Sequence, residues 1–179
     1  MKKFALVILL LSTTIAFAQT KQIVTKATVS YQIKNMGFAT TGEFGGFVGD
    51  IKFDKAHLAT SSIEASVEAK TVNSEDDMRD EHLRKADYFD VEHYPKIVIK
   101  SVSFQQKGGN NFIGQFDVTI KGKTKTVAFP FTYVQSGTAG NFKGSFKINR
   151  LDFGIGDTSM ILANEAVILV EVETTVPAS

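Results

Sequence analysis

Most of the chain after residue 22 alternates between apolar and polar residues with a period of two, the pattern of β-strands that bury one face. The clearest run is 111–121, where Phe112, Phe116 and Ile120 share one face and polar side chains, with Ile113 as the exception, occupy the other. A chain built from such runs has to fold so that every strand turns its apolar face inward.

The alternation predicts eight strands in an all-β fold. They are expected at about residues 22–35, 40–53, 60–71, 96–106, 110–121, 124–135, 140–149 and 164–176. Phe44 and Phe47 are out of phase across Gly45-Gly46, so we expect a β-bulge there. The mixed pattern of 97–104 leaves the inward face of that strand open.

Eight antiparallel strands can bury their apolar faces in a sandwich or in a barrel, and only a barrel also removes the sheet edges. An eight-stranded barrel is either filled by its own side chains or holds one small ligand. Leaving a void of about 500 Å³ unfilled would cost about 12 kcal/mol, which rivals the whole stability of a domain. The interior is therefore occupied by aromatic side chains or by a ligand.

The composition supplies material for either outcome. The chain has 15 Phe, 4 Tyr and no Trp, and the inward faces carry almost no charge. Small residues stand among the large ones at Gly114, Gly144, Ala65 and Ala69. Such residues are typical of a tunnel and equally of tapered packing.

One segment departs from the strand pattern. Ser74 precedes three carboxylates, Glu75, Asp76 and Asp77, which suit the first turn of a helix. We expect Ser74 to cap a short helix at about 75–86, within a helical insertion that extends to about 91. His82 is expected on the inward face of this helix, held by a hydrogen bond.

The N-terminus has the three parts of a secretory signal peptide. Lys2 and Lys3 precede the apolar run 4–11, and Ala16-Phe17-Ala18 provides a small-x-small cleavage site. We expect a signal peptide at 1–18 and one domain at 19–179, exported to the periplasm or the extracellular space. The apolar run is too short to span a bilayer, so no stable membrane insertion is expected.

Charge and residue types narrow the partners. Removing Lys2 and Lys3 leaves 18 basic side chains against 19 acidic ones, a net charge of −1, which argues against nucleic acid as a partner. The absence of cysteine excludes disulfides and thiolate metal sites. His82 and His93 do not have the spacing of a helical metal-binding pair, so we expect neither a metal nor a cofactor.

Two motifs point to one family. Residues 79–83 read Arg-Asp-Glu-His-Leu and are followed by Tyr-Phe-Asp-Val at 88–91 and Tyr-Pro at 94–95. Residues 150–154 read Arg-Leu-Asp-Phe-Gly. Together these stretches resemble the signature regions of the YceI family of lipocalin-like, polyisoprenoid-binding proteins, and the resemblance covers about 23–176.

The resemblance implies an extended eight-stranded antiparallel lipocalin-like barrel whose tunnel holds a polyisoprenoid, an isoprenoid quinone or a similar lipid. It also makes a homodimer plausible. With the inward faces expected above, the tunnel lining is predicted to be Val29, Tyr31, Ile33, Phe47, Ile63, Val67, Phe89, Phe112, Phe116, Phe129, Phe131, Phe142, Phe146 and Ile168. Arg79, Asp80 and His82 are predicted at the tunnel mouth.

Two alternatives remain open at the level of sequence. An enzyme acting on a lipid-like substrate would draw on Arg79, Asp80, His82 and Asp152, although no nucleophile-elbow motif or phosphate-binding glycine loop is present. A packed domain without a ligand would use the aromatic residues to fill the barrel. In that case Arg79 and Asp80 pair with each other or cap backbone groups, and Arg150 and Asp152 fix the last hairpin.

Overall fold

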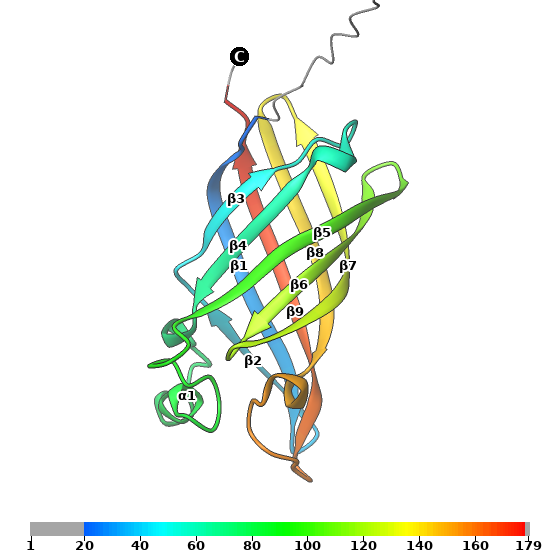
Figure 1. Ribbon diagram of the computed structural model, residues 1–179. Helices are drawn as coiled ribbons and strands as arrows, with labels where there is room; N and C mark the ends of the chain where they lie inside the picture. The colour runs from blue at the N-terminus through cyan, green and yellow to red at the C-terminus, as the bar shows by residue number, and fades with distance from the viewer. Residues whose placement is uncertain (1–19, 178–179) are drawn as a thin grey trace, which may run out of the picture.

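The computed structural model describes residues 20–177, and the expected signal peptide lies outside them. Over this range the chain forms nine strands in one antiparallel sheet, with little helix (Figure 1). The strands are β1 (Ile23–Asn35), β2 (Phe38–Phe44), β3 (Val48–Lys52), β4 (Ser62–Glu68), β5 (Lys96–Gly108), β6 (Asn111–Ile120), β7 (Lys123–Ser136), β8 (Ala139–Asn149) and β9 (Leu162–Thr175). The α-helix is α1 (Asp77–Arg84), and the 3₁₀ turns are η1 (Leu58–Thr60), η2 (Ala69–Thr71) and η3 (Arg150–Phe153).

The strand order is β2-β1-β9-β8-β7-β6-β5-β4-β3. From β3 to β9 each strand pairs with the next along the chain, and short hairpins join β5 to β6, β6 to β7 and β7 to β8. The β6–β7 turn shows the required chemistry: Lys121 and Gly122 both have positive φ, at 48° and 70°. Two successive left-handed residues match the right-handed twist of the flanking strands.

The strand expected at 40–53 is two strands, so the prediction of eight strands is corrected to nine. The chain leaves β1 at Phe44 and joins β4 at Val48. Between them Gly46 has a φ of +66°, and a Cβ there would lie 2.6 Å from Cγ of Glu68. The Glu68 amide donates to the Gly45 carbonyl at 3.0 Å. The expected bulge is therefore a change of partner strand, which only glycine permits at this position.

This change of partner brings the two edges of the curled sheet together. At one end the amide of Gln22, just before β1, donates to the carbonyl of Ile51 in β3 at 2.8 Å. At the other end Glu43 and Asn73 exchange backbone hydrogen bonds of 2.8 and 3.0 Å. The all-β fold predicted from the alternation and the lipocalin-like architecture implied by the family resemblance are both confirmed.

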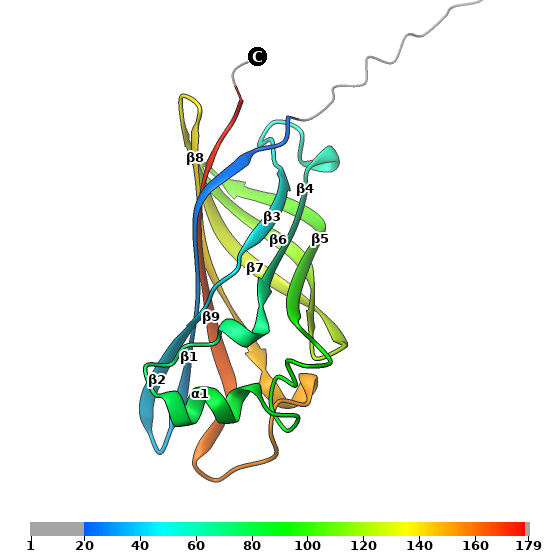
Figure 2. The same ribbon diagram turned by 90° about the vertical axis from the view of Figure 1, so that its left-hand side faces the viewer.

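The two ends of the barrel differ in what lies across them. In Figure 2, α1 and the η3 loop lie across one end, and the β7–β8 hairpin, the start of β1 and the end of β9 lie at the other. Aromatic side chains fill the terminal end. Phe53 stands at their centre, with the rings of Phe104, Phe112, Phe131, Tyr133 and Phe142 all 5.0 to 5.7 Å from its own.

Glycines make room for these rings. A Cβ on Gly114 would lie 2.3 Å from the Phe116 ring, and one on Gly144 would lie 2.7 Å from the Phe129 ring. The small residues at these two positions therefore serve tapered packing in the filled end of the barrel. We call this filled region the packed half.

Candidate ligand-binding cavity

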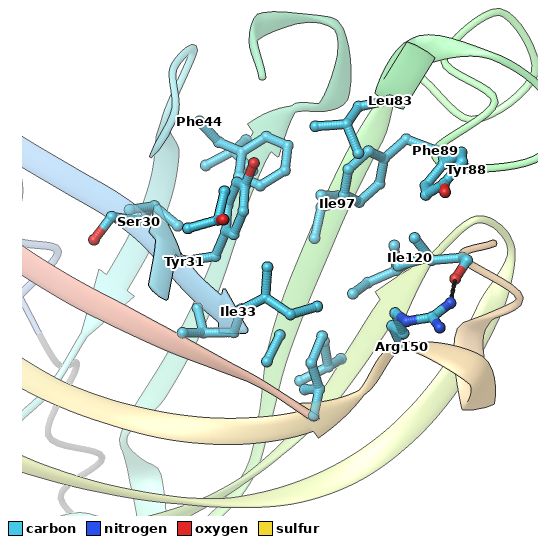
Figure 3. A pocket seen from close by; sticks show the side chains of 18 of the residues that line it. Ser30, Tyr31, Ile33, Phe44, Leu83, Tyr88, Phe89, Ile97, Ile120 and Arg150 are labelled. Carbon is cyan, nitrogen blue, oxygen red and sulfur yellow. Dashed lines mark hydrogen bonds between the residues drawn. The ribbon is translucent and has the colours of Figure 1, made fainter. Parts of the chain in front are cut away.

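A cavity of about 370 Å³ occupies the other half of the interior, between the packed aromatic rings and α1. Most of its wall is aliphatic or aromatic. Figure 3 shows Tyr31 and Phe44 facing Leu83, Phe89 and Ile97 across the space. A chamber of this size and polarity suits the apolar part of a small molecule. We call this region the hollow half.

Several long strands contribute to both halves, because successive inward positions lie at different heights along the barrel, whereas β7 borders only the packed half. In β6, Phe112 and Phe116 lie in the packed half, whereas Val118 and Ile120 line the cavity. In β9, Val172 is buried without bordering the cavity, and Ile168 lines it. The division therefore runs across the sheet.

The cavity gathers part of the predicted tunnel lining. Eight of the predicted residues border it: Val29, Tyr31, Ile33, Phe47, Val67, Phe89, Phe146 and Ile168. Six others lie in the packed half and do not border it: Ile63, Phe112, Phe116, Phe129, Phe131 and Phe142. These six face inward as predicted, but they fill the barrel instead of lining a tunnel.

Several lining residues were missing from the prediction. They include Phe44, Leu83, Tyr88, Ile97, Ile99, Val118, Ile120, Ile148, Ala166 and Val170. Of these, Ile120 had been placed on an inward face by the alternation. Tyr88 and Leu83 carry no such signal, since they belong to the helical insertion whose docking depends on tertiary contacts.

The mouth of the cavity is shaped by α1 and the residues before it. Asp76, not Ser74, is the N-cap, and its carboxylate accepts from the Arg79 amide at 3.1 Å. Ser74 is buried and accepts from Nε of Arg79 at 2.7 Å, and its hydroxyl donates to the carboxylate of Asp80. Ser74 therefore binds two side chains of the helix instead of capping it.

The three residues predicted at the mouth have different positions. Arg79 and His82 border the cavity, whereas Asp80 is buried against Ser74 and does not. His82 is exposed and packs its ring edge-on against Tyr88, with centroids 4.7 Å apart, so the inward, hydrogen-bonded position expected for it is wrong. Burial raises the pKa of Tyr31, partly offset by the nearby positive charge of Arg79.

Arg150 organises the wall opposite α1. Its guanidinium is 3% exposed and donates to the carbonyls of Ile155, Asp157 and Ala163 at 2.7 to 3.0 Å. These bonds fold the segment between η3 and β9 around one side chain. Asp152 is exposed in η3 and does not border the cavity, so the structure brings Arg79 and His82, but not Asp152, to the chamber.

Two kinds of feature are absent from residues 20–177. Among these residues no three His, Asp or Glu side chains lie close enough together to hold a metal ion. Within the same range no helix has the length and hydropathy needed to cross a bilayer.

The chain matches a known protein family over nearly all of its described residues. The model of the YceI-like domain matches residues 21–176. The chain belongs to the YceI family. The resemblance read from the motifs at 79–95 and 150–154 is thereby confirmed.

Sequence relatives include UPF0312 proteins of two bacterial genera, Vibrio and Azotobacter. A UPF0312 protein of Vibrio cholerae serotype O1 is 27% identical over 136 residues, 72% of each chain. A UPF0312 protein of Azotobacter vinelandii is 26% identical over 154 residues, 82% of this chain and 80% of the relative.

Solved structures show the same fold. The YceI-family chain matches Burkholderia cenocepacia BcnA with a TM-score of 0.80 and 31% identity, over 83% of this chain and 96% of the other. It matches a polyisoprenoid binding domain from Saccharophagus degradans with a TM-score of 0.65 and 11% identity, over 89% and 99%. The second likeness shows the fold alone.

Proposed function

We propose that this protein binds a long apolar molecule, a polyisoprenoid, an isoprenoid quinone or a similar lipid, and carries or sequesters it after export to the periplasm. The observation that carries the proposal is the 370 Å³ chamber with its apolar wall. The polyisoprenoid binding named for the Saccharophagus domain supports it, because that domain shares the fold.

Energetics favour an apolar occupant. At about 24 cal/mol per Å³, a void of this volume left unfilled would cost about 9 kcal/mol. A water molecule needs two to four polar partners, which a mostly aliphatic wall does not provide. An apolar chain satisfies the wall by contact alone and gains about 25 cal/mol per Å² of area removed from water.

Binding explains the mouth residues better than catalysis does. Arg79 and Asp80 are engaged with Ser74, and Arg150 with backbone carbonyls. These bonds fix the loops that border the chamber, and a general acid or base needs a side chain free to reach the reacting atom. We infer a carrier without cofactor or metal; a homodimer and the lack of a nucleic-acid partner remain predictions.

The test is recovery and replacement of the ligand. Protein purified from the periplasm is analysed by native mass spectrometry and by solvent extraction, and delipidated protein is then titrated with farnesol and with a quinone. We expect a co-purifying apolar molecule and saturable uptake at one site. Folded, delipidated protein that takes up neither compound would contradict the proposal.

A further inference from the structure

A second, smaller cavity of about 40 Å³ lies next to the chamber, toward the packed half. The two cavities share four wall residues: Phe47, Ala65, Ile99 and Val170. They are therefore neighbouring parts of one interior, divided by side chains. What stands between them decides how far an apolar chain can enter.

Aromatic rings form the division. Phe146 borders the large cavity and Phe129 borders the small one, and their ring centroids are 4.8 Å apart. Both side chains are 7% exposed. Phe116 packs behind them, with its centroid 5.6 Å from that of Phe129. Phe47, which borders both cavities, is half-buried. We call Phe47, Phe129 and Phe146 the aromatic floor.

We propose that the aromatic floor sets the longest apolar chain that the barrel accepts. This inference rests on the proposed function and deepens it by naming what limits the ligand. The cavity wall on β9 runs from Leu162 to Val170, eight residue steps or about 27 Å along the strand. With a strand tilt of about 40°, the chamber is about 20 Å deep.

The aromatic floor limits the length of the bound chain because the close-packed rings of the packed half resist displacement. Each methylene buried against the chamber wall strengthens binding about fourfold. A carbon that reaches the floor meets close-packed rings, and displacing a ring costs at least as much as the added burial contributes. Longer ligands therefore bind with their first units inside and the remainder outside the mouth, and gain little from the extra length.

The experiment measures affinity along a series of prenyl alcohols: geraniol, farnesol, geranylgeraniol and solanesol. Each competes with a fluorescent fatty acid for the delipidated full-length mature protein. We expect affinity to rise along the first members and solanesol to bind within about threefold of geranylgeraniol. Removing a floor ring, in Phe129→Ala or Phe47→Ala, opens room comparable with one isoprene unit. The affinity for solanesol relative to that for geranylgeraniol should then rise about tenfold.

Matched variants separate the floor from general loosening. Phe112→Ala removes the same ring from a residue that is 1% exposed and borders neither cavity, so its length profile should match the wild type. Ala65→Leu fills a shared wall and should shift the preference toward farnesol. Should Phe129→Ala not fold, the half-buried Phe47 carries the test.

The outcomes distinguish the length limit set by the aromatic floor from the proposed binding function. Affinity that keeps rising steeply up to solanesol in the wild type would overturn the floor and leave the binding function standing. An equal shift in Phe112→Ala would likewise overturn it. Folded wild-type protein that binds none of the alcohols would overturn the proposed function and the floor with it.

Discussion

Phe53 and Ile168 both face the inside of the same sheet, yet Phe53 lies in the packed half and Ile168 in the hollow half. Around Phe53 five aromatic rings lie within 5.7 Å, and Phe53 itself borders neither cavity. Around Ile168 the wall mixes aliphatic side chains with a few aromatic ones, and a chamber opens. The two halves of the barrel therefore differ in their contribution: the packed half stabilises the fold, whereas the hollow half leaves room for the proposed ligand and contributes less stability.

The sharpest way to break this comparison is to empty the packed half. Phe53→Ala should lower the free energy of unfolding by about 4 kcal/mol, because it removes the ring that five others contact. Urea denaturation measures this loss. The folded fraction should keep its ligand affinity, since Phe53 does not border the cavity; an equal loss of affinity would show that the halves are not independent.

Arg150 tests whether the hollow half depends on its buried guanidinium. Arg150→Gln should cost about 3 kcal/mol, since it leaves buried carbonyls without their charged donor. Hydrogen exchange should rise over 155–164 and stay unchanged around Phe53. Lys121→Gln, which removes a single bond to the Gly154 carbonyl, is the control and should cost much less. A uniform rise in exchange would contradict a local role.

A matched pair of isoleucines compares the halves directly. Ile51→Ala, at a position 2% exposed, should cost about 3 kcal/mol of stability and leave binding unchanged. Ile168→Ala, at a half-buried position, should cost about 1 kcal/mol and weaken binding of the proposed ligand about tenfold, because its side chain lines the chamber. Thermal melts and ligand titrations measure both. Equal stability losses would refute the division.

The smallest expected effects are those of pH, at two similar His–Asp pairs at opposite ends. The hydrogen bond with His57, 2.8 Å, lowers the pKa of Asp54, so that contribution is present above the ordinary pKa and lost as pH falls through the lowered value. The bond with Asp90 raises the pKa of His93, so that contribution is present at low pH and lost as pH rises through the raised value.

NMR titration of each group reads these shifts. Asp90→Asn should return the pKa of His93 toward its ordinary value and leave Asp54 unchanged. Both histidines are solvent-exposed, so the change in overall stability should be too small to move a melt appreciably. A large pH-dependent shift in melting would point to another group.

These comparisons also show what the sequence could predict. Alternation identified the inward faces, so Phe112, Phe129 and Ile168 were all expected inside. It carries no information about height along the barrel, which depends on strand register and on where the chain changes partner. Phe112 and Phe129 were therefore expected in a tunnel wall and lie in a filled interior, although Val118 and Ile120, on the same strand as Phe112, do line the chamber.

Two other differences between the expected and the observed structure arise from particular side-chain contacts. The change of partner at Gly45–Gly46 required knowing that Glu68 would lie against Gly46. Asp76 took the cap expected of Ser74, because burial against Arg79 and Asp80 engages the serine hydroxyl. Both outcomes depend on contacts between residues distant along the strands or across a turn, which a pattern of residue types does not encode.

The position of the chain ends has a practical consequence. The side-chain amide of Gln22 donates to the Phe53 carbonyl at 2.9 Å, and the Val176 amide donates to the Thr138 carbonyl at 2.8 Å. These two bonds hold Gln22 and Val176 at the packed half of the barrel, away from α1 (Figure 1). A fusion partner, an affinity handle or a sensor-chip linkage placed at either end would leave the chamber entrance pointing outward and unobstructed.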